Sequence, residues 1–156
     1  MNQFALVPRL HHIGVQTSDL ANSLAWYRDF LGCRPTWSTE DFSELTRSRL
    51  PGVLRLAEVA VGDLRFHLFE RDSRVARQHD TDRVQFQHVC VSTESVARLR
   101  AWRDRWLELS GSGRYVFLRD SPPTDIVVDE EGTHSFYCID VNGLEFEFTY
   151  VPEAAP

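Results

Sequence analysis

An internal repeat is the feature that most constrains how this chain can fold. Shifting the sequence by 76 positions (88 minus 12) aligns His12 with His88, and a slightly larger shift of 80 (147 minus 67) aligns His67 with Glu147. The first shift also pairs identical residues between the two histidines and the middle of each half: Val15 with Val91, Thr17 with Thr93, Ala21 with Ala97, Ala25 with Ala101, Trp26 with Trp102 and Leu31 with Leu107. The sequence therefore predicts two copies of one structural unit.

Each unit carries one metal-competent side chain near its start and one near its end. Successive side chains of a strand point to opposite faces, so Glu147 faces away from Phe146 and Phe148. The same alternation separates the three histidines from their aliphatic neighbours. A single histidine in a strand is more often a surface residue than a ligand, so the repeat carries the argument. Three imidazoles and one carboxylate suit a first-row transition metal. The predicted ligands are His12, His67, His88 and Glu147.

Helix and strand signals give the same order of elements in both halves. In the first half, a capping stretch at 17–19 and Gly32 bound a helix. Strands are expected at 10–15, 33–38, 53–61 and 64–70, with Gly62-Asp63 as a tight turn and 38–51 as a loop over the site. In the second half, a helix from 93–95 to about 109 is expected, with strands at 86–92, 115–118, 135–139 and 144–150.

This order predicts an α+β fold made of two βαβββ modules. Module one covers about residues 8–70, a polar connector about 71–83, and module two about 84–151, all within a single domain spanning 1–156. We expect curved mixed sheets with helices outside and a metal-binding cleft inside.

Composition restricts the partners and the chemistry. The formal net charge of −6 argues against a nucleic-acid partner, and the lack of a long apolar run or signal-peptide pattern favours a cytoplasmic protein without a membrane anchor. All 17 basic residues are arginine, which excludes a lysine base or Schiff-base chemistry. The three cysteines are too widely spaced for a zinc knuckle or a disulfide framework. Cys90 shares the face of His88, and we interpret it as a small buried hydrophobic residue.

Three stretches make the chain similar to the vicinal oxygen chelate superfamily, which contains glyoxalases, epimerases, fosfomycin- and bleomycin-resistance proteins and extradiol dioxygenases. The stretches are His12-Ile13-Gly14-Val15, residues 25–32 (AWYRDFLG) and residues 136–143 (FYCIDVNG) leading to Glu147. The resemblance covers nearly the whole chain. It implies that the metal is held by His12, His88 and Glu147.

Within the superfamily, the chain most resembles a small two-module extradiol dioxygenase. That resemblance implies iron(II), dioxygen and a small aromatic substrate, a catechol such as L-DOPA or another natural-product precursor. It makes His67 the acid–base catalyst and Tyr137 a hydrogen-bond donor to the substrate, with His134 either an outer donor near the site or a surface residue. Val141 departs from the extradiol signature, which has proline at this position.

Two other functions are also compatible with this sequence. A lyase or isomerase of the glyoxalase or epimerase type would use Ni²⁺, Co²⁺, Zn²⁺ or Mn²⁺, with His67 as a fourth ligand. A non-catalytic protein that binds an antibiotic is a further alternative. Arg65 and Arg55 are candidates for binding a substrate carboxylate, or form surface ion pairs. A homodimer is compatible with the family resemblance.

Overall fold

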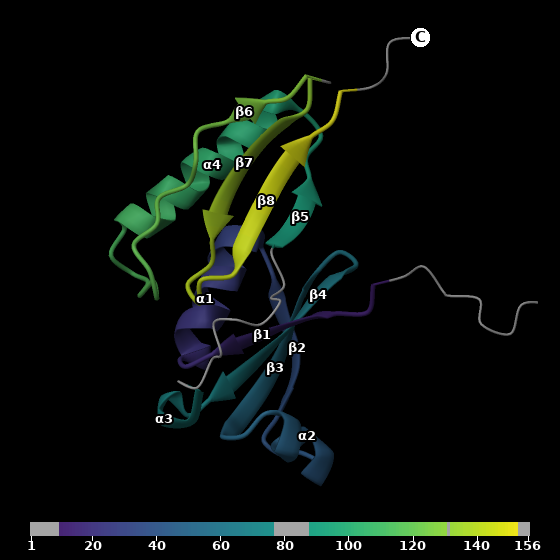
Figure 1. Ribbon diagram of the computed structural model, residues 1–156, viewed down its shortest axis with the longest axis vertical. Coiled ribbons are helices and arrows are strands. Elements are labelled where there is room, and N and C mark those ends of the chain that lie inside the picture. Colours follow the sequence, from purple (N-terminus) through teal and green to yellow (C-terminus); the bar gives the residue numbers. More distant parts are fainter. Residues whose placement is uncertain (1–9, 77–87, 131, 153–156) are drawn as a thin grey trace, which may run out of the picture.

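The computed structural model describes residues 10–76, 88–130 and 132–152 and contains two four-stranded sheets, one above the other along the long axis (Figure 1). Sheet A has the order β1 (Ile13–Thr17), β4 (Leu64–Arg71), β3 (Val53–Val61) and β2 (Arg34–Thr39). Sheet B has the order β5 (His88–Ser92), β8 (Glu145–Tyr150), β7 (His134–Ile139) and β6 (Val127–Val128). In each sheet the first two strands of this order run parallel and the other neighbours antiparallel. The predicted pair of α+β modules with mixed sheets is confirmed.

The two long helices begin and end where local chemistry requires. In α1 (Leu20–Leu31), the Asp19 side chain accepts a hydrogen bond from the backbone N–H of Asn22 at 3.0 Å, and Gly32 ends the helix with φ of 75°. In α4 (Val96–Gly111), Ser95 caps the first turn. These caps satisfy N–H groups that the helix itself leaves unpaired. In the described part of the chain, no helix has the length and apolar character needed to cross a membrane.

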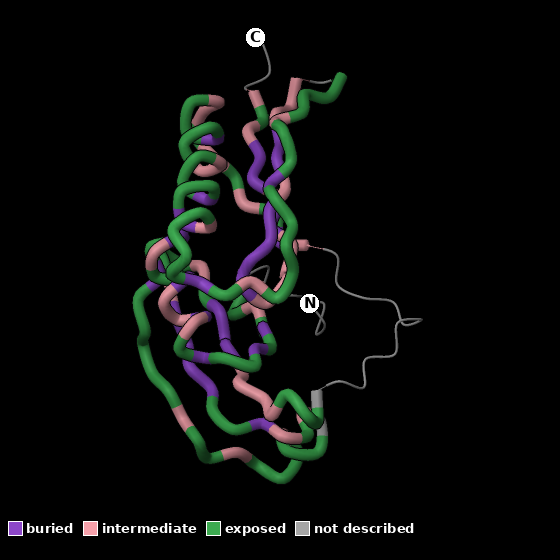
Figure 2. The backbone as a smooth tube through the Cα atoms, turned by 90° about the vertical axis from the view of Figure 1, so that its left-hand side faces the viewer, coloured by how far each residue is buried: buried purple, intermediate pink, exposed green. Residues whose placement is uncertain are grey.

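Helix α1 is packed between the two modules. Its Trp26 and Tyr27 are fully buried, Tyr27 lies 4.9 Å from Phe66 of sheet A, and Trp26 lies 6.3 Å from Phe146 of sheet B, measured between ring centroids. Buried residues of both sheets accordingly belong to one hydrophobic cluster, and Figure 2 shows buried segments in both halves of the molecule. The two modules therefore share one aromatic core.

Hydrogen bonds reinforce this junction. The Tyr27 hydroxyl donates to the buried carboxylate of Asp140 at 2.9 Å, and Ser23 lies within hydrogen-bond distance of Asn142. The Asn22 amide both donates to and accepts from the backbone of Val116. Unpaired buried polar groups are costly, so this network opposes any rotation of one module against the other.

Two predicted elements are wrong. Residues 115–118 form no strand, because the backbone of Val116 pairs with the Asn22 side chain and Leu118 N–H donates to Val141 instead of to a strand; the edge of sheet B is the short β6. The predicted loop 38–51 contains a helix, α2 (Glu44–Arg49), capped by the Ser43 side chain. The connector contains a further short helix, α3 (Ser73–Ala76). Residues 77–83 of the connector, and residues 86 and 87 of the strand predicted at 86–92, lie outside the described residues.

Candidate metal centre

Strand register repeats between the modules as the sequence repeat requires. Gly14 pairs with His67 in sheet A, and Cys90 pairs with Glu147 in sheet B. Gly14 lies two positions after His12, and Cys90 lies two positions after His88. All four predicted ligands lie on the sheet face opposite the buried aromatic core. Each sheet thus presents half of a candidate site, which we call half-site A and half-site B.

In half-site A, His12 immediately precedes β1 and stacks on His67 of β4. The ring centroids are 3.7 Å apart and the ring planes differ by only 5°. His12 is exposed, whereas His67 is buried. Partial burial and the neighbouring imidazole of His67 lower the pKa of His12. His12 therefore favours the neutral form that a metal ligand needs.

A carboxylate that the sequence analysis did not single out anchors His67. Glu58 of β3 lies opposite His67 in the register, and its Oε2 is 2.8 Å from His67 Nε2. Its Oε1 accepts hydrogen bonds from Thr36 at 2.6 Å and from Arg65 at 3.0 Å. Hydrogen bonds from Thr36 first and then from His67 lower the pKa of Glu58 to about 2, against the opposing effect of burial. Glu58 is therefore ionised and fully paired.

The register would have revealed this pair. A two-residue turn at Gly62-Asp63 pairs Val61 with Leu64, and counting outward from that pair places Glu58 opposite His67. A lone carboxylate in the apolar run of β3 was the corresponding signal in the sequence.

A cavity of about 540 Å³ opens beside half-site A, between the sheet and the segment that contains α2. Both His12 and His67 line it. Its apolar wall is made of Phe42, Leu45, Leu50, Leu56 and Phe69. Among the described lining residues, Asp41 is the only one with a carboxylate and none carries a guanidinium group.

Half-site B contains His88 and Glu147 in contact. His88 Nε2 is 3.1 Å from Glu147 Oε2. Two ligands bonded to one ion at about 2.1 Å and at right angles lie about 3 Å apart, so this spacing fits a shared metal. His88 Nδ1 is buried without a hydrogen-bond partner among the described residues; the nearest carboxylate oxygen, of Glu145, is 3.6 Å away.

Two more side chains share this face of sheet B. The ring of Tyr137 lies 5.8 Å from that of His88, and burial followed by a hydrogen bond to Glu147 raises the pKa of Tyr137. Cys90 lies beside Glu147 and is exposed, so our interpretation of it as a small buried residue is wrong. Burial of part of its thiol and the charge of Glu147 raise the pKa of Cys90 to about 11, which keeps the thiol protonated.

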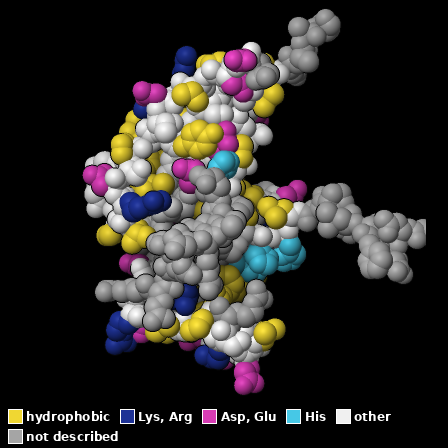
Figure 3. All heavy atoms as spheres, viewed as in Figure 1, with side chains coloured by type: hydrophobic (Ala, Val, Ile, Leu, Met, Phe, Trp, Pro, Cys, Tyr) yellow, Lys and Arg dark blue, Asp and Glu magenta, His cyan; other side chains and the backbone are white. Residues whose placement is uncertain are grey.

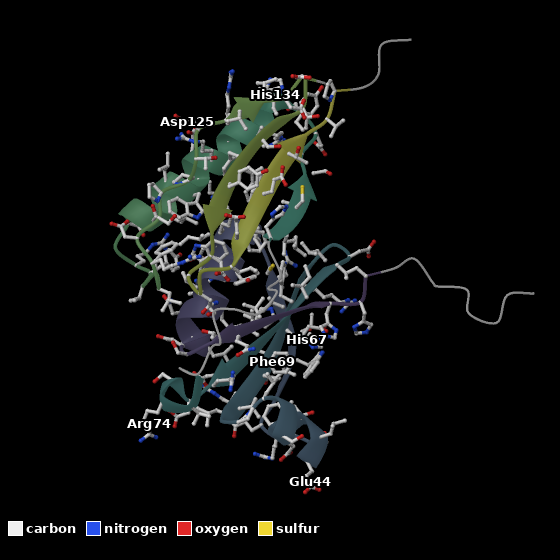
Figure 4. The ribbon with its side chains drawn as sticks, in the orientation of Figure 1. Glu44, His67, Phe69, Arg74, Asp125 and His134 are labelled. Atoms are coloured by element: carbon white, nitrogen blue, oxygen red, sulfur yellow. The ribbon has the colours of Figure 1, made fainter. Side chains whose placement is uncertain are left out.

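The two half-sites do not meet within one chain. Among the described residues, no group of three or more histidine, cysteine, aspartate or glutamate side chains is arranged to hold a metal. Histidine atoms lie in two separate places on the face shown in Figure 3. His134 belongs to neither half-site. It alternates to the face opposite Tyr137, its Nδ1 lies 2.9 Å from the carbonyl oxygen of Gly132, and Figure 4 shows it at the far end of sheet B.

The donor set itself suits a divalent metal. His12, His88 and Glu147 together supply two imidazole nitrogens and one carboxylate, the combination that leaves open coordination positions on iron(II). The structure brings together the last two of these residues and leaves the first on the other sheet.

The chain belongs to the Glyoxalase/Bleomycin resistance protein/Dioxygenase superfamily, whose family model matches residues 9–150. This superfamily contains many metalloenzymes. Among curated proteins, none matches this chain.

Solved structures with the same fold include members of differing activity. A lactoylglutathione lyase from Agrobacterium tumefaciens is 20% identical with a TM-score of 0.59, over 92% of this chain and 93% of that one. The fosfomycin resistance protein FosX from Listeria monocytogenes, solved with Mn(II) and sulfate, is 17% identical with a TM-score of 0.59, over 95% and 96% of the two chains. A glyoxylase/bleomycin resistance protein/dioxygenase domain from Frankia sp. EAN1pec is 17% identical with a TM-score of 0.65, over 92% and 97%. Likeness at these identities shows the fold alone.

Proposed function

We propose that this protein is an iron(II)-dependent extradiol dioxygenase that opens the ring of a catechol. In this proposal His12, His88 and Glu147 hold the metal, and His67 transfers protons without binding it. The observation that carries the proposal is the parallel stack of His12 on His67.

The stack argues against a shared metal ion for these two histidines. The lone pair of an imidazole nitrogen lies in the ring plane, so a bound ion also lies close to that plane. Two stacked rings that are 5° from parallel, with centroids 3.7 Å apart, leave no position near them at which one ion lies close to both ring planes. A fourth-ligand role for His67, which the lyase or isomerase reading requires, would need one ring to leave the stack.

His67 has the environment of a proton-transfer group. Its Nε2 is engaged by Glu58, it lines the cavity, and a neutral imidazole can take a catechol proton and later return it. His12, His88 and Glu147 would hold iron(II) with open coordination positions, and the metal would supply the activation of catechol and dioxygen. Tyr137 lies on the ligand face of sheet B. Its hydroxyl is hydrogen-bonded to Glu147, and once Glu147 held the metal it would hydrogen-bond a substrate oxygen instead.

The cavity favours a flat apolar substrate over an anion. Arg65 and Arg55, the two candidates for binding a substrate carboxylate, are paired instead with Glu58 and Glu70. Glutathione carries two carboxylates and fosfomycin a phosphonate, and neither finds a cation among the described residues of this wall. An aromatic ring fits the phenylalanine and leucine side chains.

We further propose that the centre forms between two copies of the chain. The aromatic core and the hydrogen bonds around α1 fix the two sheets relative to each other, so closing the half-sites within one chain would break buried contacts. In a two-fold dimer, half-site A of each chain meets half-site B of its partner, and two equivalent centres result.

Oxygen uptake tests the activity. The protein is loaded anaerobically with iron(II), a panel of catechols that includes L-DOPA is added, and air is admitted in an oxygen electrode while absorbance reports the ring-opened product. We expect one dioxygen consumed per catechol opened, and none with Glu147→Gln. Conversion of a thiohemiacetal or an acyl thioester under nitrogen, with Ni²⁺, Co²⁺, Zn²⁺ or Mn²⁺, would replace the proposal with a lyase or isomerase. Tight binding of bleomycin without turnover would replace it with a sequestering protein.

A further inference from the structure

We propose that Glu58 is a positioning residue that holds His67 in a single tautomer, with the proton on Nε2 and Nδ1 as the only basic atom of the ring. The tautomer follows from the structure alone. Its catalytic consequence rests on the proposed function, because only a reaction that removes a proton from the substrate requires a basic nitrogen at this position.

The direction of the hydrogen bond is set by its surroundings. Glu58 is only 4% exposed, and its other oxygen already accepts from the Thr36 hydroxyl and the Arg65 guanidinium. An ionised carboxylate has no proton to give, so the proton shared at 2.8 Å belongs to His67 Nε2. The low pKa of Glu58 is consistent with this assignment.

Packing fixes the ring as well as its proton. Glu58 and His67 are directly paired across the antiparallel strands β3 and β4, so the backbone sets their separation. Trp37 meets the His67 ring edge-on at 5.3 Å, and His12 covers one of its faces. A 180° flip of the ring would exchange Nε2 with Cε1, so it would break the bond to Glu58.

The consequence is chemical. With the proton on Nε2, the neutral ring presents a lone pair at Nδ1 and can accept a proton from a substrate hydroxyl. In the opposite tautomer, Nδ1 carries the proton and His67 cannot act as a base through that atom. A side chain positioned for proton transfer contributes about 10²- to 10⁴-fold to a rate, and loss of the correct tautomer removes part of that contribution.

Nitrogen-15 spectra of the imidazole rings test the tautomer directly. The metal-free full-length chain is labelled at its histidine ring nitrogens, and the His67 signals are assigned by their absence in His67→Gln. We expect the neutral ring to carry its proton on Nε2 and none on Nδ1. In Glu58→Gln, the amide can donate as well as accept, so we expect the two tautomers to mix.

Two control variants separate positioning from general damage. Thr36→Val removes a partner of Glu58 but leaves the bond to His67, and Glu70→Gln repeats the substitution at a carboxylate that is paired with Arg55 and does not contact His67. Both should keep the wild-type tautomer.

Kinetics complete the test. Glu58→Gln should lower kcat, by no more than the about 10²- to 10⁴-fold that a proton-transfer group supplies, with KM changed less than about threefold and iron content unchanged. A wild-type His67 protonated on Nδ1 would overturn the proposal, and so would a tautomer that Glu58→Gln leaves unchanged. The wild-type measurement decides the matter even if that variant does not fold. A confirmed tautomer in a protein that opens no catechol would refute the proposed function and leave the positioning role standing.

Discussion

Mixing two inactive variants should restore activity if the metal centre forms between two chains. His12→Ala removes a ligand from half-site A, and Glu147→Ala removes one from half-site B. Each homodimer then lacks one ligand at both centres, and we expect neither variant to take up oxygen. In a mixed dimer, the intact half-site A of one chain meets the intact half-site B of the other.

The number of complete centres in a mixed dimer determines how much activity returns. One of the two centres in a mixed dimer has all three ligands, and the other lacks two. Mixed dimers isolated with two different affinity tags should therefore show about half of the wild-type activity and bind about one iron per dimer. Random exchange from an equal mixture makes about half of the dimers mixed, so the unfractionated sample should recover about a quarter of the activity.

A matched control uses two variants of the same half-site. His12→Ala mixed with His67→Gln leaves no intact half-site A in any dimer, so no activity should return. The assay is oxygen uptake with iron analysis on the same samples, and light scattering reports the mass. Mixed dimers of His12→Ala and Glu147→Ala that form but stay inactive would refute the shared centre, as would a wild-type monomer with full activity.

Three further predictions concern single residues. Tyr137→Phe should slow ring opening while iron content stays at the wild-type value, as measured by oxygen uptake and metal analysis; loss of iron would instead make Tyr137 a support for Glu147. The pKa of Glu58 in the folded protein is about 2, below its ordinary 4.5. The stabilisation from this carboxylate is therefore complete above pH 4.5 and is lost as the pH falls toward 2. In urea unfolding, Glu58→Gln should accordingly lose less stability in acid than the wild type does. Phe146→Ala should lower the free energy of unfolding by about 3–5 kcal/mol in the same assay, since Phe146 of β8 is fully buried against Trp26 of α1 and Phe66 of sheet A.

Much of each module could be predicted because the relevant interactions are local. Capping side chains and Gly32 determine where α1 begins and ends, and alternation along β4 and β8 determines which face His67 and Glu147 occupy. Turn length determines the register of β3 and β4. That register also places Glu58 opposite His67, although Glu58 has none of the spacing that marks the metal ligands.

The relation between the sheets could not be predicted, because it depends on contacts between distant residues. Spacing indicates the face of a side chain within its own sheet, not the direction in which that sheet points. The orientation is determined by α1, whose aromatic residues pack against both sheets, and by the bond between Tyr27 and Asp140, which are 113 positions apart. The failed strand prediction at 115–118 has the same origin, since Val116 pairs with a side chain of α1 and not with a strand.

In the proposed dimer, the two half-sites of each centre come from different chains and supply different parts of the reaction. Half-site A carries the apolar cavity and the base His67, whereas half-site B carries two of the three ligands and Tyr137. A lone chain could hold a metal through His88 and Glu147 only, away from the cavity beside half-site A, so both substrate selection and full coordination would require the dimer. Loss of a ligand weakens a metal site by more than the loss of an outer partner does, and dilution below the dimer dissociation constant should therefore release iron and abolish activity together. Half-site A would keep its His67–Glu58 pair under the same dilution, because that pair is formed entirely within one hairpin.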